Sequence, residues 1–243
     1  MNPILIEVHF FPSIDYIARC IQTDSVIIEA YEHFQKGSYR NRCHIAGANG
    51  LQVLSVPLRR NNDIKNDIKN DIKNDIKNDI KNDIKNDIKN DIKNDIGDIR
   101  GIKNVRIAYD VDWQKQHWRS LQTAYGSAPF WDFYAPVFER FFTSKFDFLL
   151  DYNVEILKII FKLLKIDKTV NISLSTTYND VFTEGVDFRN TINPKINNSI
   201  NSTNPVIYSQ LFNDRYAFMP HLSVLDLLFC CGNQSLSILK KNI

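Results

Sequence analysis

The chain opens with two short apolar runs that flank a segment of helical periodicity. ILIEVHF at 4–10 and SVIIEA at 25–30 have the apolar, β-branched composition of buried strands. Between these runs, Pro12 and Ser13 mark the start of a helix, and apolar residues then recur at helical spacing. A strand, a helix and a strand within about 30 residues form a βαβ-like unit, which favours neighbouring parallel strands.

The rest of the chain predicts a hairpin followed by helices. In CHIAGANGLQVLSVPL, at 43–58, GANG is a turn signal between two β-rich runs. Further helices are expected at 113–125, from Pro129, at 147–165 and at 222–229, and strands at 105–109, 171–175 and 206–212. We therefore expect a single α/β domain over 1–243, in which an N-terminal mixed sheet holds the hairpin and the helical second half packs on it.

The tetrapeptide NDIK occurs eight times in succession from Asn62 to Lys93. Asn and Asp disfavour both helices and strands, and a period of four places like charges at i+4 in a helix. We therefore interpret 62–96 as a flexible, solvated insert in a surface loop, with a frayed, projecting helix as the alternative. Lengthening a loop from about 6 to about 40 residues costs only about 1.7 kcal/mol, which a folded domain tolerates.

Composition excludes several classes of protein. The 243 residues carry a net charge of +2, which is too balanced to predict nucleic-acid binding. The four cysteines form no CxxC pair, and the N-terminus lacks the pattern of a signal peptide, so we expect reduced thiols in a cytoplasmic protein. The most apolar stretch, at 154–166, is too short to span a bilayer and reads as a core-facing amphipathic helix, with a membrane-surface helix as the alternative.

Known cofactor and metal motifs are absent from the sequence. It contains no glycine-rich phosphate loop, GxSxG elbow, HExxH motif or paired Cys/His cluster, so no cofactor and no metal site are predicted. Chemistry must instead come from less specific stretches. In GSYRNR, at 37–42, Arg40 and Arg42 alternate on a strand, so both guanidinium groups could grip a phosphate or carboxylate. A solvated strand edge, or pairing with an acid inside the fold, is the structural alternative.

Two later stretches carry further candidates. In DWQKQHW, at 112–118, His117 lies on an aromatic stripe and could be either a packed core residue or a general acid or base, while the tryptophans could form a platform for a sugar or base. In FMPHLSVLDLLF, at 218–229, Asp226 lies in an otherwise apolar helix and needs a partner, which Arg40, Arg42 or His117 could supply. A purely structural ion pair is the alternative. Ser223 could cap the first turn of this helix.

These stretches together resemble the WbqC-like family of bacterial proteins, and most closely its Bacteroidetes branch. The resemblance is carried by HFFPSIDYIARC, SYRNRCHIAGANGLQVLSVPL, IKNVRIAY, WQKQHWRSLQTAYGSAPFWDFY and FMPHLSVLDLLFCCG. It implies a role in surface polysaccharide synthesis, where transfer of glycine to an amino sugar of the O-antigen has been proposed for the family. Carried over by position, the functional residues are Asn41, Arg42, His117, Tyr125, Ser223 and Asp226. No nucleophile is implied.

Two functional hypotheses follow. In the first, the protein is an enzyme that forms an amide on a sugar amine: His117, oriented by Asp226, takes a proton from the amine, and Arg40 and Arg42 hold the phosphate of a nucleotide-sugar or carrier. Asn41, Tyr125 and Ser223 would complete substrate binding. In the second, the protein is a non-catalytic binding or assembly protein of envelope biogenesis.

Overall fold

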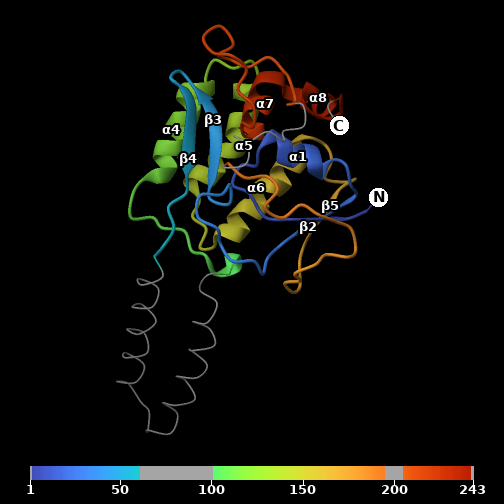
Figure 1. Ribbon diagram of the computed structural model, residues 1–243. Helices are drawn as coiled ribbons and strands as arrows, with labels where there is room; N and C mark the ends of the chain where they lie inside the picture. The colour runs from blue at the N-terminus through green and yellow to red at the C-terminus, as the bar shows by residue number, and fades with distance from the viewer. Residues whose placement is uncertain (1, 61–100, 195–204, 242–243) are drawn as a thin grey trace, which may run out of the picture.

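The computed structural model describes residues 2–60, 101–194 and 205–241, and the predicted repeat insert at 62–96 lies outside them (Figure 1). Within the described residues, the central sheet has four parallel strands in the order β5-β2-β1-β6. The strands are β1 (Ile4–Ile6), β2 (Ser25–Ile28), β5 (Asn171–Leu174) and β6 (Val186–Asp187). The α/β class and the parallel neighbours expected from the opening residues are thus confirmed.

Helix α1 (Ile14–Cys20) connects β1 to β2. Ser13 caps its N-terminus, because the Ser13 hydroxyl accepts a hydrogen bond from the N–H of Tyr16 at 3.3 Å. The side chains of Tyr16, Ile17 and Cys20 are buried in the core. The strand, helix and strand predicted from periodicity therefore form one continuous unit.

The register of the strands places a row of side chains along one side of the sheet. Leu5 lies opposite Ile27, and Ile27 lies opposite Ser173. Backbone hydrogen bonds of 2.8 Å from the N–H groups of Glu29 and Ser175 to the neighbouring strand continue the pairing by one residue beyond the ends of β2 and β5. Because alternate residues of a strand point to the same side, Glu29 and Ser175 extend this row toward the carboxyl ends of the strands.

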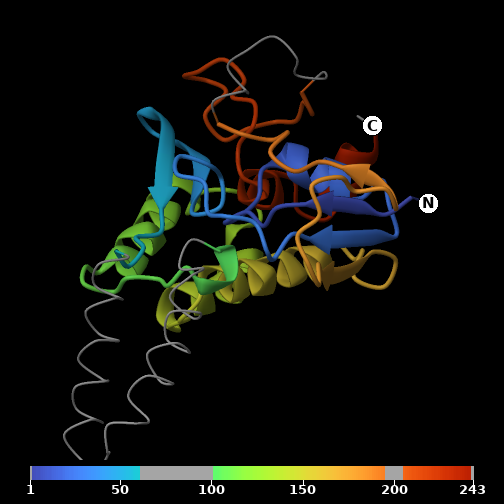
Figure 2. The same ribbon diagram turned by 60° about the horizontal axis from the view of Figure 1, so that its bottom comes forward.

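The predicted hairpin is present as β3 (Arg42–Gly47) and β4 (Gly50–Ser55), paired antiparallel. Gly50 has a φ of 98°, which glycine adopts without strain, so the GANG turn signal is confirmed. The hairpin forms a two-stranded sheet of its own and lies on the other side of the molecule from the parallel strands (Figures 1 and 2). The expected single mixed sheet is therefore divided into two.

Contacts at the free edge of β3 explain this division. The N–H of Ser223 donates to the carbonyl of His44 at 2.8 Å. The N–H of Ala46 donates to the hydroxyl of Tyr125 at 3.1 Å. Because helical segments occupy these backbone groups, a strand of the parallel sheet cannot pair with β3 at these positions.

The described helices other than α1 all follow residue 101. They are α4 (Trp113–Tyr125), α5 (Trp131–Thr143), α6 (Leu149–Leu163), α7 (Val224–Cys231) and α8 (Ser235–Lys241), with short 3-10 turns η1 (Ile102–Asn104) and η2 (Gly232–Gln234). The first four overlap predicted helices, and Gly232, with a φ of 57°, ends α7 as expected. None of the described helices is long and apolar enough to cross a membrane.

Two of the predicted strands do not form regular strands. Segment 105–109 makes only isolated bridges, to Leu58 and to Phe148 at the start of α6. Segment 206–212 is irregular, because side chains rather than backbone groups hold it: the hydroxyl of Tyr208, for example, bonds to a carboxylate at 2.6 Å. Apolar β-branched composition alone did not distinguish these buried connections from strands.

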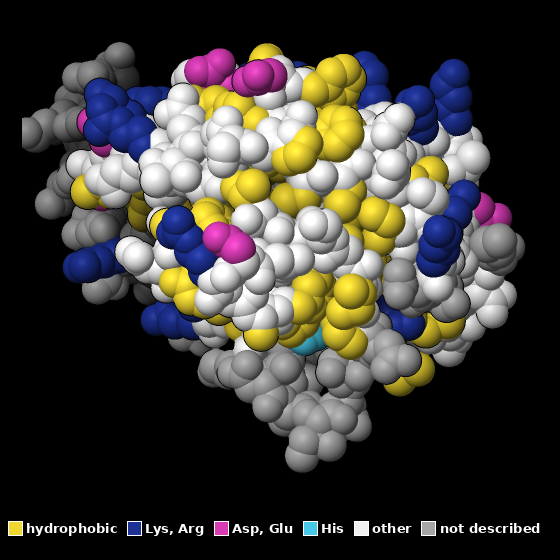
Figure 3. Space-filling view, turned by 90° about the horizontal axis from the view of Figure 1, so that it is seen from above, with side chains coloured by type: hydrophobic (Ala, Val, Ile, Leu, Met, Phe, Trp, Pro, Cys, Tyr) yellow, Lys and Arg dark blue, Asp and Glu magenta, His cyan; other side chains and the backbone are white. Residues whose placement is uncertain are grey.

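Hydrophobic side chains are prominent on the surface seen from above (Figure 3). They gather across the middle of this face, whereas lysines and arginines stand mainly toward its margins and carboxylates are few. Positive charge on this face is therefore dispersed and does not form a single patch.

Candidate functional site at the carboxyl edge of the parallel sheet

Acidic side chains follow two neighbouring strands of the parallel sheet at their carboxyl ends. Glu7 follows β1, and Glu29 and Glu32 follow β2. These residues are buried, with exposed fractions of 1%, 0% and 5%. Buried carboxylates require partners, and ligands of open α/β sheets bind at this edge. The edge therefore combines buried charge with the position where such folds hold their ligands.

Glu29 accepts hydrogen bonds from several directions. Nη1 of Arg189 donates to one carboxylate oxygen at 3.1 Å. The hydroxyl of Ser175 donates to the other oxygen at 2.7 Å, and the N–H of Tyr31 donates to the same oxygen at 2.9 Å. The Ser175 hydroxyl in turn accepts from the N–H of Ala30 at 3.0 Å, so its orientation is fixed.

Arg40 is fully buried and forms a bidentate ion pair with Glu32. Its Nε donates to one carboxylate oxygen at 2.6 Å, and its Nη2 donates to the other. Nη2 also donates to the side-chain oxygen of Asn190 at 2.9 Å. Burial alone would lower the pKa of Arg40, but the bonds to Glu32 outweigh it and raise the pKa, so the guanidinium remains charged.

Glu7 joins the same network. One of its oxygens accepts from the N–H of Asn190 at 2.8 Å, and the other lies 3.1 Å from Nε2 of His9. Burial would raise the pKa of Glu7, but the contact with His9 and the charge of Arg40 leave it lowered. Burial lowers the pKa of His9, whose Nδ1 has no hydrogen-bond partner within the described structure.

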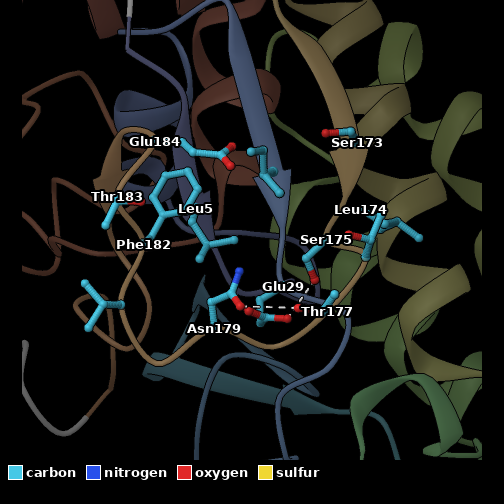
Figure 4. Close-up of a pocket in the computed structure, with 13 residues that line it drawn as sticks. Leu5, Glu29, Ser173, Leu174, Ser175, Thr177, Asn179, Phe182, Thr183 and Glu184 are labelled. Atoms are coloured by element: carbon cyan, nitrogen blue, oxygen red, sulfur yellow. Dashed lines mark hydrogen bonds between the residues drawn. The ribbon is translucent and has the colours of Figure 1, made fainter.

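A pocket of about 190 Å³ opens beside Glu29, over the side of the sheet that carries the row of Leu5, Ile27 and Ser173 (Figure 4). Loop 176–184 supplies much of its lining. Hydrogen-bonding side chains predominate: Glu29, Ser173, Ser175, Thr176, Thr177, Asn179, Thr183 and Glu184. Figure 4 shows Glu184 at one end, the Glu29–Ser175 hydrogen bond at the other, and Phe182 between them. Such a lining suits a ligand that carries several hydroxyl groups.

Arg189 connects the loop at 176–184, which lines the pocket, to the parallel sheet. Its guanidinium forms an ion pair with Asp187 at 2.7 Å and another with Glu29 at 3.1 Å. It also donates to the carbonyl of Asp180 at 3.4 Å and lies 5.0 Å from the ring centre of Tyr178. One side chain thus connects the floor of the pocket to its covering loop.

The two arginines of GSYRNR have different surroundings. Strand β3 begins at Arg42, so Arg40 precedes the strand and pairs with an acid inside the fold, which was the structural alternative for this residue. A fully buried, paired Arg40 cannot hold a phosphate alongside Arg42. Asn41 donates to the carbonyl of Val56 at 2.9 Å, which ties the start of β3 to the segment after β4.

Arg42 and His117 lie on opposite sides of the hairpin. Gln52 of β4 donates to Ser120 of α4 at 3.1 Å, so its side of the hairpin faces the helix that carries His117. Gln52 pairs directly with Ile45, which therefore points to that side too. Arg42 is three residues before Ile45 and points the other way, because side chains alternate along a strand.

His117 is packed among aromatic rings with 8% of the residue exposed. Its ring centre lies 5.1 Å from that of Trp113 and 6.2 Å from that of Phe10. Nδ1 is buried without a hydrogen-bond partner in the described structure. Burial lowers the pKa of His117 to about 4, so the ring is neutral at pH 7 and is a weak base.

Asp226 is paired with tyrosines in place of the partners expected from the sequence. The hydroxyl of Tyr125 donates to one oxygen at 2.8 Å, and the hydroxyl of Tyr208 donates to the other at 2.6 Å. Both carboxylate oxygens are thus occupied by groups other than His117 and the arginines. Burial raises the pKa of Asp226, and the two tyrosine hydrogen bonds oppose this rise. Ser223 caps α7 as expected, accepting from the N–H of Leu225 at 3.3 Å.

The structure therefore brings together Tyr125 and Asp226 among the candidates, but places Arg40, Arg42 and His117 in three other surroundings. The residues that build the pocket were missed in the sequence. One signal was available: Glu7 and Glu29 directly follow the apolar runs ILI and SVII, where parallel strands present their carboxyl ends. No sequence signal indicated Arg189, because it lies in a polar stretch 160 residues from Glu29.

Fold and site together define an α/β protein with a polar pocket beside the carboxyl edge of a parallel sheet. The chain belongs to the WbqC-like protein family, whose family model matches residues 8–96 and 73–188, two segments that overlap within the repeat. The matched residues include Glu29, Arg40 and His117 and end before Arg189 and Asp226. No curated protein and no solved structure matches the chain.

Proposed function

We propose that this WbqC-like protein transfers an aminoacyl group, such as glycyl, or another acyl group to an amino sugar in surface polysaccharide synthesis, and that the pocket beside Glu29 holds the amino sugar. The proposal rests on the kinds of side chain that line this pocket. Serine, threonine and asparagine side chains can bond the hydroxyl groups of a sugar, and Phe182 offers an apolar face to its ring. We place the reaction in the cytoplasm.

Glu184 is the group best placed to bind the ammonium group of the amino sugar and to accept its proton. It lines the pocket and is exposed, whereas Glu29 is fully buried and already bonded by Arg189 and Ser175. The Glu184 carboxylate would bind the ammonium group and accept its proton. The freed amine nitrogen then attacks the carbonyl carbon of an activated donor, the new amide C–N bond forms, and the bond from carbonyl carbon to leaving group breaks. The second amine proton leaves with the leaving group or to water.

The surroundings of the cysteines favour direct transfer without a thioester on the protein. Burial raises the pKa of all four thiols, and that of Cys231 reaches about 11, so none is a thiolate at neutral pH. The same observation supports the second candidate, a non-catalytic protein of envelope biogenesis that binds an amino sugar in this pocket. The two candidates differ only in whether an amide product forms.

The test is to incubate the purified protein with a nucleotide-linked amino sugar and activated glycyl or acyl donors, and to detect the amide by mass spectrometry. Glu184→Gln should lower the rate by about 100-fold, the lower range for loss of a general base, with Glu139→Gln on the exposed face of α5 as the matched control. His117→Gln should keep most of the activity, because its ring is a weak base. Loss of activity in His117→Gln with full activity in Glu184→Gln would show that His117 of α4, and not Glu184, accepts the proton. Binding of the sugar with no product from any donor would support the non-catalytic candidate.

A further inference from the structure

Basic side chains meet on the outer side of the hairpin, which faces away from α4. Arg42 and His44 are two residues apart on β3 and therefore point to the same side. The N–H of Ser223 donates to the carbonyl of His44 at 2.8 Å. This bond places the segment that carries His221, two residues before Ser223, beside His44.

Charges around His44 are mainly positive. Burial lowers the pKa of His44, and the neighbouring Arg42 and His221 lower it further. The carboxylate in this group is Asp15 of α1, which lies 2.8 Å from Nδ1 of His221. The hydroxyl of Tyr39 lies 3.4 Å from Nδ1 of His44. An anion bound between Arg42 and His44 would relieve their mutual repulsion.

Arg42 differs from Arg40 because its guanidinium has hydrogen-bond donors without partners in the described structure. It has no ion-pair partner within the described part of the chain, and its Nε is buried without a hydrogen bond. Arg40, in contrast, is bonded to Glu32 and Asn190. An unpaired guanidinium presents a planar fork of donors that matches the oxygens of a phosphate.

We infer that Arg42, His44 and His221 form a binding site for a phosphate-bearing ligand, and specifically for the diphosphate of a nucleoside diphosphate. Arg42 bonds the phosphate oxygens through its fork, and the two imidazoles donate from the neighbouring positions. The choice of a diphosphate follows from the donors, because two linked phosphates can meet the Arg42 fork and both imidazoles at once. The site goes beyond the proposed function, because the hairpin lies on the other side of the molecule from the parallel strands beside which the amino sugar would bind. The site is built from β3 and the segment before α7, apart from the residues that line the pocket beside Glu29.

Calorimetric titration with UDP, with uridine as the phosphate-free comparison, tests this site. UDP should bind at least tenfold more tightly than uridine. Arg42→Gln should lower UDP affinity by at least tenfold, and Arg42→Lys, which keeps the charge but loses the fork, should fall between it and the unaltered protein. Arg119→Gln, on an exposed position of α4, should bind UDP normally.

The pH dependence gives a second readout. A bound diphosphate favours protonated His44, so UDP affinity should rise as pH falls from 8 to 6, with proton uptake seen as a dependence on buffer ionisation enthalpy. The groups that face His44 are Arg42, Tyr39 and His221, with Asp15 behind His221. In His44→Gln the proton uptake should shrink. Equal affinity for UDP and uridine, or unchanged UDP affinity in folded Arg42→Gln, would overturn the inference.

The two proposals fail separately. UDP binding that depends on Arg42, without amide formation, would refute the proposed transfer and leave the diphosphate site standing. Amide formation from a nucleotide-linked amino sugar, with no loss in Arg42→Gln and no UDP binding, would refute the diphosphate site and leave the transfer standing. Pyrophosphate as a competitor separates the phosphates from the nucleoside: competition supports recognition of the diphosphate, and its absence contradicts it.

Discussion

Glu32 and Asp226 are both buried carboxylates, but the molecule stabilises them differently. Glu32 forms a bidentate ion pair with the buried guanidinium of Arg40. Asp226 accepts one hydrogen bond from each of two tyrosine hydroxyls. The first arrangement neutralises a charge with a charge, and the second supplies neutral donors to a carboxylate whose pKa burial has raised.

The two ways of stabilising a buried carboxylate occur in different parts of the molecule. The ion pair belongs to a network of charged groups at the carboxyl edge of the parallel sheet, and Glu29 of this network forms part of the pocket. Asp226 lies in α7, where its tyrosine bonds join that helix to α4 and to the segment before it. We therefore interpret the Asp226 cluster as a structural clamp and the Glu29 network as the support of a binding site.

The largest effect is expected from breaking the ion pair on one side only. Arg40→Met leaves Glu32 buried without its cation and should lower the free energy of unfolding by about 3–5 kcal/mol. The double variant Arg40→Met/Glu32→Gln should recover part of this loss, because the unpaired charge is gone. Urea denaturation measures both. Arg140→Met, whose side chain is 52% exposed and 3.9 Å from Glu155, is the control and should change stability by less than about 1 kcal/mol. A double variant no more stable than the single one would contradict the charge argument.

His117 extends the comparison, because it is a buried titratable group whose Nδ1 has neither kind of partner among the residues that the structure describes. Folding lowers its pKa from about 6.5 to about 4, so the unfolded chain binds a proton more readily than the folded protein. The free energy of unfolding should therefore decrease by about 3 kcal/mol as pH falls from about 6.5 to about 4, and this contribution should then level off.

His117→Phe provides the measurement for this prediction. Between pH 7 and pH 4, the free energy of unfolding of the unaltered protein should fall by about 3 kcal/mol relative to that of the variant, because the variant lacks the group that takes up the proton. Parallel stability curves across this range would show that His117 does not titrate with a lowered pKa.

Smaller losses are expected in the Asp226 cluster. Tyr208→Phe and Tyr125→Phe each remove one hydrogen bond to the carboxylate and should cost about 1–3 kcal/mol. Tyr125→Phe should cost more, because the Tyr125 hydroxyl also accepts from the N–H of Ala46 at 3.1 Å. In an Asp226→Asn background both losses should shrink, since no charge remains to be solvated. Chemical denaturation of the three single variants and the two double variants measures the coupling, and equal losses in both backgrounds would refute it.

Periodicity and turn signals were sufficient for much of the fold. The amphipathic stripes of α4 and α6, the GANG turn and the strands on either side of α1 are all local patterns, so they could be predicted from the sequence. The strand predicted at 206–212 failed, because its Tyr208 serves a carboxylate on α7 and a backbone ladder does not form there.

The site depends on contacts that no local pattern encodes. A partner for buried Asp226 was expected, but Tyr125 is 101 residues away in the chain and Tyr208 is 18. Glu29 and Arg189 are separated by 160 residues and meet only because β6 adds to the sheet beside β1. Residue type predicted that these groups need partners, whereas topology decides which partners they have.

The smallest effect should come from His221 and Asp15, a pair that is only partly buried, with 14% and 27% of the side chains exposed. The hydrogen bond to Asp15 raises the pKa of His221, although burial opposes the rise. Folding therefore raises the proton affinity of His221, so its contribution to stability is fully present below the unfolded pKa of about 6.5 and is lost as pH rises through the folded pKa. His221→Asn should lower the free energy of unfolding by at most about 1 kcal/mol at pH 6 and by less at pH 8. Urea denaturation at the two pH values measures both losses, and a loss far above about 1 kcal/mol at pH 6 would contradict the small contribution expected from a partly exposed pair.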